Sequence, residues 1–595
     1  MGKGSQNKIS SNRDWYDQLD RRLHPFSRFV VWTILFQVVF LVYWPSLKAP
    51  FVYDDIPCIA ANPDLRFPFE LGRFFSNHES SMQFDHRPLV GILTMINFQV
   101  AGLDVVAYRI LNLLIHWSVA VVLGEFIIRL AMHFKVSGGR LMGMVTSVTW
   151  ALHPLNTVTV IFISQRMESL MVLFYLLSLW SLFKAGKSGK IRYLIGSLVA
   201  AVACLAGKEV GVSLLASLLM LDRVCHFGSW KELAAIRWEF YLVSIIVWGA
   251  FVSWWMSGER IAELQGMVLS DPWLYFKTEC RVLVDYVRKV FWPSPLVFVA
   301  SPKVPVKWME WGPFAVMLTL GFLVCARIAW KGQKWVWVPA FLFFLVLGPT
   351  SSFLPIPQEP EAEWRMYLPS ACILVLFLAG CRFLVRKLEI NPRILGIVLM
   401  GSILALAVGS WQRATTYRTA VSLWTDNVNK DPLSSKAWVN LGVSHYQQNN
   451  FEGVANVSKV LWNLGVSFDD PFTRANSLHM AAWVEMDRED FSKAETLLRQ
   501  ALSEESLGRY RPDFAYTLIR QGKIDEALEQ LEICLKRNPE EVYALALYGE
   551  ALIKSGKVEE GEIAHALCAK IAKNSAPLIE AKKRVEEHRL KIREE

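Results

Sequence analysis

The sequence predicts an all-α protein made of two parts, a bundle of membrane-spanning helices and a solenoid of helical repeats. Of its 595 residues, 53% are hydrophobic, including 24 Trp and 35 Phe, which is too apolar for a soluble multidomain protein of this length. From about residue 412 the composition changes to segments rich in Ala, Leu and Glu, in which short sequences recur 34 positions apart. Membrane spans and helical repeats both consist of helices, so the whole fold is expected to be helical.

The membrane-spanning helices can be counted from the apolar segments. A helix needs about 20 apolar residues to cross a bilayer, and eleven segments come close to that length: 28–47, 107–131, 141–159, 167–184, 191–206, 209–224, 237–256, 311–329, 335–353, 368–386 and 392–411. The shorter stretch 88–102 contains polar residues, so we expect it to lie at the membrane surface. Lys and Arg concentrate in cytoplasmic loops. With eleven spans the basic clusters share the side of the N-terminus, whereas a twelfth span would place them outside.

The span count also predicts the domains. Residues 1–27 form a cytoplasmic N-terminal segment, 28–411 a membrane domain with outer loops at 48–106 and 257–310, and 412–595 a repeat domain. An odd number of spans places the repeat domain on the outer side of the membrane. In the second outer loop, residues such as Tyr275 and Tyr286 have helical spacing, and Arg288 and Lys289 are expected to face lipid headgroups.

Charge and cysteine content exclude several other classes of protein. The net charge of +9 resides in short loops between apolar runs, so it indicates membrane topology and no nucleic-acid partner. The nine Cys residues contain no CxxC spacing, so neither a zinc site nor a disulfide framework is indicated. Cys534 and Cys568 occupy equivalent places in neighbouring repeats; buried thiols are the usual state there, and a disulfide is the alternative.

Charged and polar residues collect on the predicted outer face of the membrane domain. Ionisable groups at membrane depth are costly unless they are paired or face water, which makes them candidates for function. The candidates are Asp54, Asp55, His86, Arg87, His153, Arg166, Glu168, Lys208, Glu209, Glu363 and Arg365. Each has a structural alternative: the two Asp could form a solvated turn, His153 a satisfied helix break, and Lys208 with Glu209 a salt bridge. Independent structural pairs should not all select one face, so the set favours function.

The chemistry of this set suits a phosphate-bearing substrate. Arg, Lys and His can hold a phosphate leaving group while a carboxylate accepts a proton from an attacking hydroxyl. The bilayer supplies the apolar part of the substrate, so a lipid-linked phosphate is expected. Asp54 and Asp55 could also share a divalent metal such as Mg²⁺ or Mn²⁺. Neighbouring side chains point in different directions, so we expect at most one of the two to be central.

The C-terminal region resembles tetratricopeptide repeats, in which pairs of helices stack into a concave solenoid. Gly522 and Lys523 recur as Gly556 and Lys557, 34 positions later. Trp438 and the following Leu-Gly pair fit the start of such a repeat. We expect four repeats beginning near 434, 471, 509 and 542, followed by a charged cap at 577–595.

The chain as a whole resembles the transmembrane and tetratricopeptide-repeat-containing O-mannosyltransferases and their bacterial relatives, which have the C-type glycosyltransferase fold. The resemblance covers most of residues 28–570. It rests on Tyr53-Asp54-Asp55, Arg87-Pro88-Leu89, Asn112 to His116, Leu152 to Thr157, Gln165 to Glu168, Gly207-Lys208-Glu209 and Arg365 to Pro369. Two departures are Trp364, which separates Glu363 from Arg365, and Asn156 to Val158 after His153-Pro154.

The resemblance implies an inverting glycosyltransferase that moves a sugar from a polyprenyl-phosphate carrier to a Ser or Thr hydroxyl of a protein. It implies that Asp54 or Asp55 is the base and that the outer cations bind the lipid phosphate. The acceptor protein would be presented by the repeat domain, on the periplasmic side of a bacterial inner membrane. Two alternatives stay open: a ligase that transfers a whole lipid-linked glycan, and a non-catalytic membrane-anchored scaffold.

Overall fold

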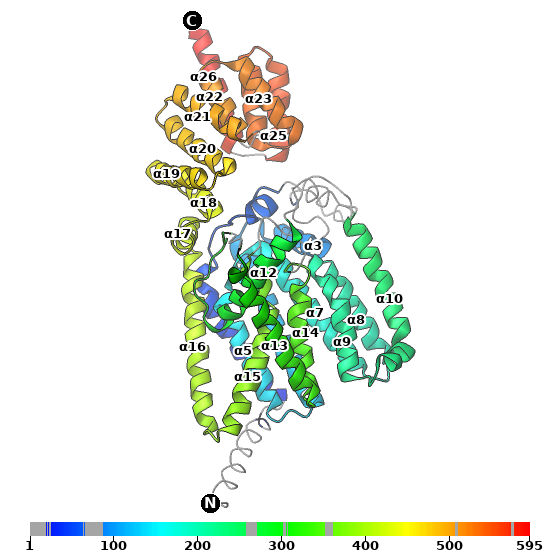
Figure 1. Ribbon diagram of the computed structural model, residues 1–595. Coiled ribbons are helices and arrows are strands. Elements are labelled where there is room, and N and C mark those ends of the chain that lie inside the picture. Colours follow the sequence, from blue (N-terminus) through cyan, green and yellow to red (C-terminus); the bar gives the residue numbers. More distant parts are fainter. Residues whose placement is uncertain are drawn as a thin grey trace, which may run out of the picture. The chain divides into compact units, whose positions relative to one another are not determined.

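A computed structural model describes residues 20, 22, 25–62, 65, 87–256, 271–301, 305, 307–351, 361–505, 510–572 and 576–594. Every regular element in these described ranges is a helix, which confirms the predicted all-α class (Figure 1). The chain divides into two compact units, Met1–Leu423 and Trp424–Glu595. The boundary lies inside helix α17 (Ala420–Lys430).

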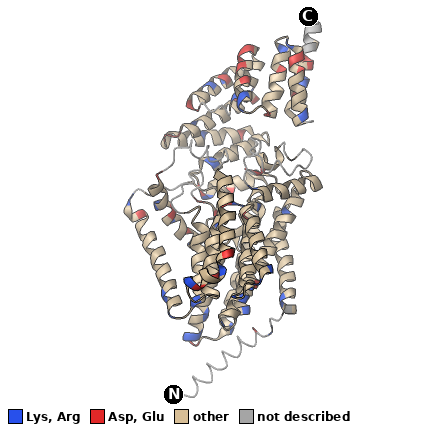
Figure 2. Ribbon diagram, turned by 90° about the vertical axis from the view of Figure 1, so that its right-hand side faces the viewer, with Lys and Arg blue, Asp and Glu red and all other residues tan. Residues whose placement is uncertain are grey.

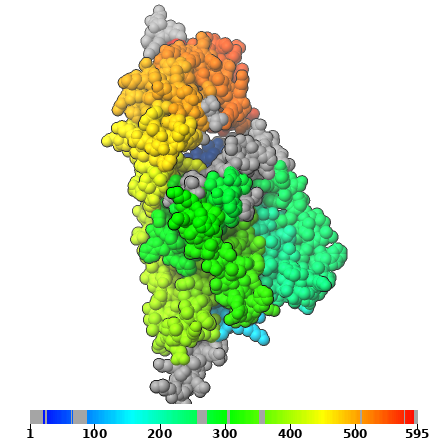
Figure 3. All heavy atoms as spheres, viewed as in Figure 1, coloured from blue at the N-terminus to red at the C-terminus, as the bar shows by residue number. Residues whose placement is uncertain are grey.

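Among the described residues of the first unit, seven helices are long and apolar enough to cross a membrane. They contain α2 (Pro25–Tyr43), α4 (Val105–His133), α7 (Arg166–Ala185), α10 (Trp230–Met256), α13 (Gly312–Trp330), α15 (Pro369–Lys387) and α16 (Pro392–Thr416). In the most apolar window of α16 only 6% of the residues are buried within the protein, and in that of α13 only 11%. Apolar faces this exposed require lipid around them. Figure 3 shows α10 and α13 on the outside of this unit.

Four of the eleven predicted spans correspond to shorter helices. They are α5 (Gly139–Ala151), α8 (Ile191–Leu205), α9 (Leu214–Cys225) and α14 (Trp337–Leu347). At 1.5 Å per residue these helices are roughly 17–23 Å long, less than the hydrocarbon thickness of a bilayer. The predicted span 141–159 ends early because His153 has an extended backbone before Pro154, which starts a separate 3₁₀ turn. The predicted surface helix is α3 (Pro88–Ala101).

The centre of the first unit is a packed core that fixes the ends of several helices. Trp150 of α5 is fully buried, and its indole N–H donates to the carbonyl of Tyr367 over 2.6 Å. The Tyr367 hydroxyl lies 2.7 Å from Nδ1 of His116 on α4. These contacts join α4 and α5 to the segment before α15. The charged residues of the candidate site are attached to the same helix ends.

One sequence prediction about the first unit is wrong. Lys289 was expected to face lipid headgroups, but its side chain is only 3% exposed. It lies on α12 (Pro272–Phe291), close to three carboxylates. The apolar residues of the helix follow the predicted spacing. Burial of a lysine reflects its ion-pair partners, and two of the three, Glu361 and Glu363, come from another part of the chain that a periodicity argument does not show.

In its described residues the second unit contains the end of α17, then four helix pairs and a final helix. The pairs are α18 (Ser435–Tyr446) with α19 (Phe451–Ser467), α20 (Pro471–Asp487) with α21 (Phe491–Glu504), α22 (Arg511–Arg520) with α23 (Ile524–Arg537), and α24 (Val542–Lys554) with α25 (Val558–Ile571), followed by α26 (Ala576–Glu594). They begin within two residues of the predicted repeat starts. Buried residues such as Leu498, Ala527 and Leu531 form a continuous core across neighbouring pairs, as expected for stacked repeats.

The turn inside each repeat contains a residue with left-handed backbone geometry. In the last two repeats this residue is Gly522 or Gly556, with φ of 78° and 89°. In the first two repeats Asn449 and Glu489 take the position, with φ of 54° and 59°. Glycine adopts positive φ without a steric penalty, whereas a residue with a Cβ does so at a cost. The four turns therefore have the same shape but different backbone energies.

All nine cysteines are free thiols in the structure. The thiol of Cys534 lies 2.8 Å from a carboxylate oxygen of Glu541, and that of Cys568 lies 3.4 Å from the carbonyl of Val542. Each thiol therefore has a local partner within the repeats. The alternative of a disulfide between them is not realised.

Truncation of Leu531 tests the continuity of the repeat core. Leu531 is fully buried, so Leu531→Ala is expected to lower the free energy of unfolding of the second unit by about 2–5 kcal/mol. Hydrogen-exchange mass spectrometry on the full chain measures this as faster exchange in α22 to α24. Leu433→Ala is the control, because Leu433 is 52% exposed. Equal effects of the two substitutions would contradict a core that is continuous through Leu531.

Candidate functional site

The acidic turn, residues 53–55, follows the first long apolar helix directly. Tyr53 has φ of 52°, a left-handed conformation that is uncommon for a residue with a bulky side chain. The peptide N–H of Asp55 bonds to the carbonyl of Val52, and a single π-helical turn (Ile56–Ala60) follows. Strained backbone and π-turns both concentrate at functional sites. This turn orients its two carboxylates differently: Asp54 is partly exposed, whereas Asp55 is fully buried.

Asp55 is attached to the start of α7 through Ser164. One carboxylate oxygen, Oδ1, accepts hydrogen bonds from the Ser164 backbone N–H (2.8 Å) and hydroxyl (2.6 Å). The other oxygen, Oδ2, is buried and forms no hydrogen bond with the described part of the chain. Burial raises the pKa of Asp55 to about 6, against the opposing effects of Ser164 and the positive charge of Arg109. Asp55 therefore fixes the turn in place.

Two buried arginines surround the acidic turn. Arg109 of α4 donates to the carbonyls of Leu47, Ala49 and Pro50, so it holds the segment that leads into the turn. Arg166 is only 1% exposed and is held by three acceptors. They are Oδ1 of Asn112 (2.7 Å), Oδ1 of Asn97 (3.1 Å) and the carbonyl of Tyr108 (3.1 Å). Both arginines thus connect α4 with neighbouring segments and add positive charge beside Asp55.

The predicted residues around 208 form two ion pairs. Arg87, which precedes α3, contacts both carboxylate oxygens of Glu209, at distances of 2.9 to 3.1 Å. Nζ of Lys208 lies 2.6 Å from Oε2 of Glu168. The two pairs differ in exposure: the side chains of Lys208 and Glu168 are 8% and 2% exposed, whereas Glu209 is 28% exposed. Solvent, or a ligand, can therefore reach Glu209 most easily, whereas the side chain of its partner Arg87 is only 5% exposed.

The two predicted histidines have different outcomes. Nδ1 of His153 accepts the backbone N–H of Leu155 (3.1 Å), so the proton lies on Nε2, which is 2.9 Å from the carbonyl of Val290. Both ring nitrogens are therefore used by the backbone, and His153 connects its helix break to α12. His86 lies outside the described residues.

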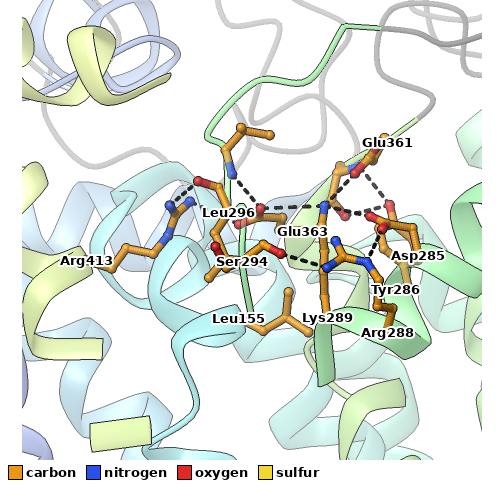
Figure 4. Close-up of polar contacts among 12 residues, drawn as sticks. Leu155, Asp285, Tyr286, Arg288, Lys289, Ser294, Leu296, Glu361, Glu363 and Arg413 are labelled. Atoms are coloured by element: carbon orange, nitrogen blue, oxygen red, sulfur yellow. Dashed lines mark hydrogen bonds and ion pairs between the residues drawn. The ribbon is translucent and has the colours of Figure 1, made fainter. Parts of the chain in front are cut away.

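Glu363 belongs to a charged group that the sequence did not reveal. We call it the Lys289 cluster, and it consists of Asp285, Lys289, Glu361, Glu363 and Arg413 (Figure 4). Nζ of Lys289 lies 2.5 Å from Glu361, 3.1 Å from Asp285 and 3.9 Å from Glu363. The second oxygen of Glu363 lies 3.0 Å from Arg413 of α16. Burial alone would lower the pKa of Lys289, but the three carboxylates raise it.

The Lys289 cluster also fixes the loop after α12. The backbone N–H of Val297 donates to Oε1 of Glu363 over 2.7 Å, and Arg413 donates to the carbonyl of Leu296 over 2.6 Å. Two consecutive residues of this loop, Leu296 and Val297, are therefore held by the cluster. The next residue, Phe298, is thereby positioned.

Aromatic rings connect this loop to the acidic turn. The ring of Tyr53 lies 6.0 Å from Phe298 at 90° and 6.4 Å from Phe162. Phe162 also contacts Phe298 (5.0 Å) and Trp364 (6.5 Å). Phe162 lies two residues before Ser164, and Trp364 lies between Glu363 and Arg365. The rings therefore place the Lys289 cluster and the acidic turn in one site.

Arg365 has its own buried acidic neighbour. Its guanidinium lies 3.8 Å from Glu279 of α12 and donates to the carbonyl of Thr350 over 3.2 Å. Tyr275 donates to the same carbonyl over 2.7 Å. Burial raises the pKa of Glu279 to about 7, and the charge of Arg365 opposes that rise. Arg365 thus belongs to the same wall of the site, formed by α12.

Sequence reasoning missed Ser164, Arg109, Glu279 and most of the Lys289 cluster. One local signal was present: Asp285 and Lys289 are four residues apart and share a helix face. The partners of the others lie far away in the chain, so no local pattern indicates them. For a metal, the described residues contain no group of three or more His, Cys, Asp or Glu that could hold an ion.

The long apolar helices around buried ion pairs, together with the repeats, define a multi-pass membrane protein with a tetratricopeptide-repeat region. A family model described as tetratricopeptide repeat matches residues 513–577. This match falls on the last two helix pairs.

Sequence comparison extends this to known proteins. The chain is 22% identical to the mouse protein O-mannosyl-transferase TMTC3, over 92% of this chain and 64% of the relative. It is 22% identical to the Caenorhabditis elegans protein O-mannosyl-transferase F38B6.6, over 69% of this chain and 59% of the relative. A 28% identical region is shared with human protein O-mannosyl-transferase TMTC2, over 39% of this chain and 28% of the relative. The homologues are thus protein O-mannosyl-transferases, which confirms the resemblance, and the chain spans about three fifths of the first two.

The raised pKa of Asp55 predicts a pH-dependent gain in stability for Asp55→Asn. The folded protein binds this proton more tightly than the unfolded chain, whose pKa is near 3.8. The contribution of Asp55 to stability therefore falls as pH rises from about 4 to about 6, by about 3 kcal/mol. Asparagine keeps an acceptor for Ser164 and removes the charge. The melting temperature of Asp55→Asn relative to wild type should be higher at pH 7.5 than at pH 5.

Asp104→Asn is the matched control for this measurement. Asp104 is exposed and caps α4 by accepting from the N–H of Val106, and asparagine caps helices equally well. The control should show no gain that grows with pH. A gain of Asp55→Asn that is equal at both pH values would contradict a raised pKa for Asp55.

Proposed function

We propose that this protein is an inverting glycosyltransferase that moves a sugar, mannose by analogy with its homologues, from a polyprenyl-phosphate carrier to a Ser or Thr hydroxyl of a protein. The observation that carries the proposal is the acidic turn, with one locked carboxylate and one accessible carboxylate. It occurs beside buried cations in a chain whose homologues are named protein O-mannosyl-transferases. The same arrangement supports a C-type, polyprenyl-phosphate-dependent enzyme.

Asp54 is the base in this proposal, and Asp55 positions it. Asp54 is partly exposed, so an acceptor hydroxyl can approach it, whereas Asp55 is fully buried and holds Ser164. The Asp54 carboxylate accepts the proton as the hydroxyl oxygen forms a bond to the anomeric carbon. The bond from that carbon to the phosphate oxygen breaks from the opposite side, and the phosphate leaves with the electron pair. One displacement of this kind inverts the anomeric configuration.

Arg87 is the cation that we assign to the lipid phosphate. The side chain of Arg87 is itself only 5% exposed, but its partner Glu209 is 28% exposed, so a phosphate that displaces this carboxylate would reach the guanidinium from the solvent side. Glu168, Lys208, Arg166, Glu363, Arg365 and His153 are buried and held by protein groups. We assign these residues to the wall that positions the acidic turn and Arg87. Preorganised charge of this kind does not have to rearrange during the reaction.

The repeat region presents the acceptor protein in this proposal. Tetratricopeptide repeats form extended concave surfaces suited to binding other proteins. The predicted topology places the acidic turn and the repeat region on the outer, periplasmic side of a bacterial inner membrane, where lipid-linked sugars and exported proteins meet. No divalent metal is required by the base that we assign.

Asp54→Asn is expected to reduce transfer of sugar at least ~100-fold, because a positioned base contributes about 10²–10⁴ to a rate. The assay follows transfer from a polyprenyl-phosphate sugar to an acceptor protein by mass spectrometry, with and without a chelator. Asp104→Asn is the control, because Asp104 is an exposed carboxylate of the same unit. Full activity in correctly folded Asp54→Asn would overturn the role of base. A whole glycan on the acceptor would identify a ligase, and activity of the detached repeats alone would identify a scaffold.

Arg87→Gln is expected to raise KM for the lipid-linked donor by about 10- to 100-fold, as loss of a charge-assisted contact does, with a smaller fall in kcat. Arg327→Gln is the control, because Arg327 is an exposed arginine at the end of α13. The measurement is initial rate against donor concentration. An unchanged donor KM would remove Arg87 from the phosphate site and leave the proposal for Asp54 in place.

A further inference from the structure

Three exposed cations lie over two aromatic rings at the C-terminal ends of α4 and α7 and the start of α8. This group is far from the acidic turn. Arg129 and Lys184 lie over the indole ring of Trp180, at 5.4 and 4.7 Å from its centre. Arg192 lies 4.7 Å from the ring centre of Tyr193, and Lys184 also lies 5.8 Å from that ring. The five residues come from α4, α7 and α8. We call them the aromatic–basic site.

None of the three cations forms an ion pair with a carboxylate of the described residues. Other basic residues of this unit do so: Lys187 with Glu232 at 2.5 Å, and Arg237 with Asp222 at 3.3 Å. An aromatic ring attracts a cation but does not neutralise it. The aromatic–basic site therefore carries uncompensated positive charge on preoriented side chains. Figure 2 shows that Lys and Arg of this unit lie mostly at helix ends.

The position of Arg192 indicates an anionic ligand in particular. Arg192 is the second residue of α8, and Lys190 before the helix provides no side-chain cap. The helix dipole disfavours a cation at an N-terminus and favours an anion there. Lys184 differs, because it lies in the last turn of α7, where the dipole favours a cation. An anion here would interact favourably with the N-terminus of α8 and with the side chains of Lys184 and Arg192.

An exposed apolar stripe begins beside the cations. Ile191, Ile195, Val199 and Val202 lie on one face of α8, with exposed fractions of 69%, 55%, 63% and 47%. The spacing of three and four residues makes the stripe continuous along the helix. A free phosphate would use only the cations, whereas a phospholipid would use both the cations and the stripe.

We propose that the aromatic–basic site binds an anionic phospholipid. Its phosphate contacts Arg129, Lys184 and Arg192, and its acyl chains lie along the apolar stripe of α8. Lys184 is eighteen residues along α7 from Arg166, which places the two roughly 27 Å apart at 1.5 Å per residue. The site is therefore separate from the candidate glycosyltransferase site, and its ligand is not the sugar donor held there.

The test uses the full-length protein, delipidated in detergent and titrated with phosphatidylglycerol while bound lipid is counted by native mass spectrometry. Replacing Arg129, Lys184 and Arg192 together by Gln is expected to weaken phosphatidylglycerol binding by roughly 10- to 100-fold. Binding of phosphatidylcholine should change less than about twofold, because its headgroup has no net charge. Trp180→Phe should give a smaller loss, since a weaker ring holds the cations less firmly.

The matched control replaces Lys331, Lys334 and Arg393 by Gln. These three are exposed basic residues with no aromatic partner among the described contacts, so the change in net charge is the same. An equal loss in this control would overturn the proposal, since binding would then follow overall charge. Competition by inorganic phosphate at the same concentration as the lipid would also overturn it, by showing a free-anion site. The replaced side chains are exposed in both triple variants. Circular dichroism checks that both variants fold.

Discussion

The structure of the membrane unit depends on compensation of charges that are buried among apolar helices. Breaking a buried ion pair by removing one partner typically costs 3–5 kcal/mol, because the remaining charge is left without compensation. In this unit the partners come from segments far apart in the chain. Lys208 pairs with Glu168 forty residues away, and Lys289 pairs with Glu361 seventy-two residues away. Each pair therefore acts as a connection that fixes one helix end against another.

The acidic turn is fixed in place by these buried groups, although most of the ion pairs do not include its own residues. Asp55 is fixed by Ser164, the rings of Phe162 and Phe298 pack on Tyr53, and the Lys289 cluster holds the loop that carries Phe298. These contacts place Asp54 at the surface of a rigid wall. The role of base that we propose for Asp54 requires rigidity, because a displacement of about 1 Å can cost about 10²-fold in rate. The many buried charges and the partly exposed Asp54 thus have complementary roles.

The fold was predictable from the sequence because its signals are local. Apolar segments and a repeat of 34 residues are contained within short stretches, and the helix pairs begin at Ser435, Pro471, Arg511 and Val542, close to the expected positions. The site was predictable only as a set of residue types. Local spacing could not show that both nitrogens of His153 bond to the backbone, or that Lys289 is buried among carboxylates. Those facts depend on contacts between distant segments.

The backbone of the four repeat turns has a consequence for how the solenoid opens. Asn449 and Glu489 adopt the left-handed conformation that Gly522 and Gly556 adopt without strain. Asparagine tolerates this conformation, so the cost of roughly 1–2 kcal/mol falls on the turn of the second repeat, which has Glu489. The family model recognises residues 513–577, the half with the glycines. The turn at Glu489 is therefore where thermal fluctuations should open the solenoid most readily.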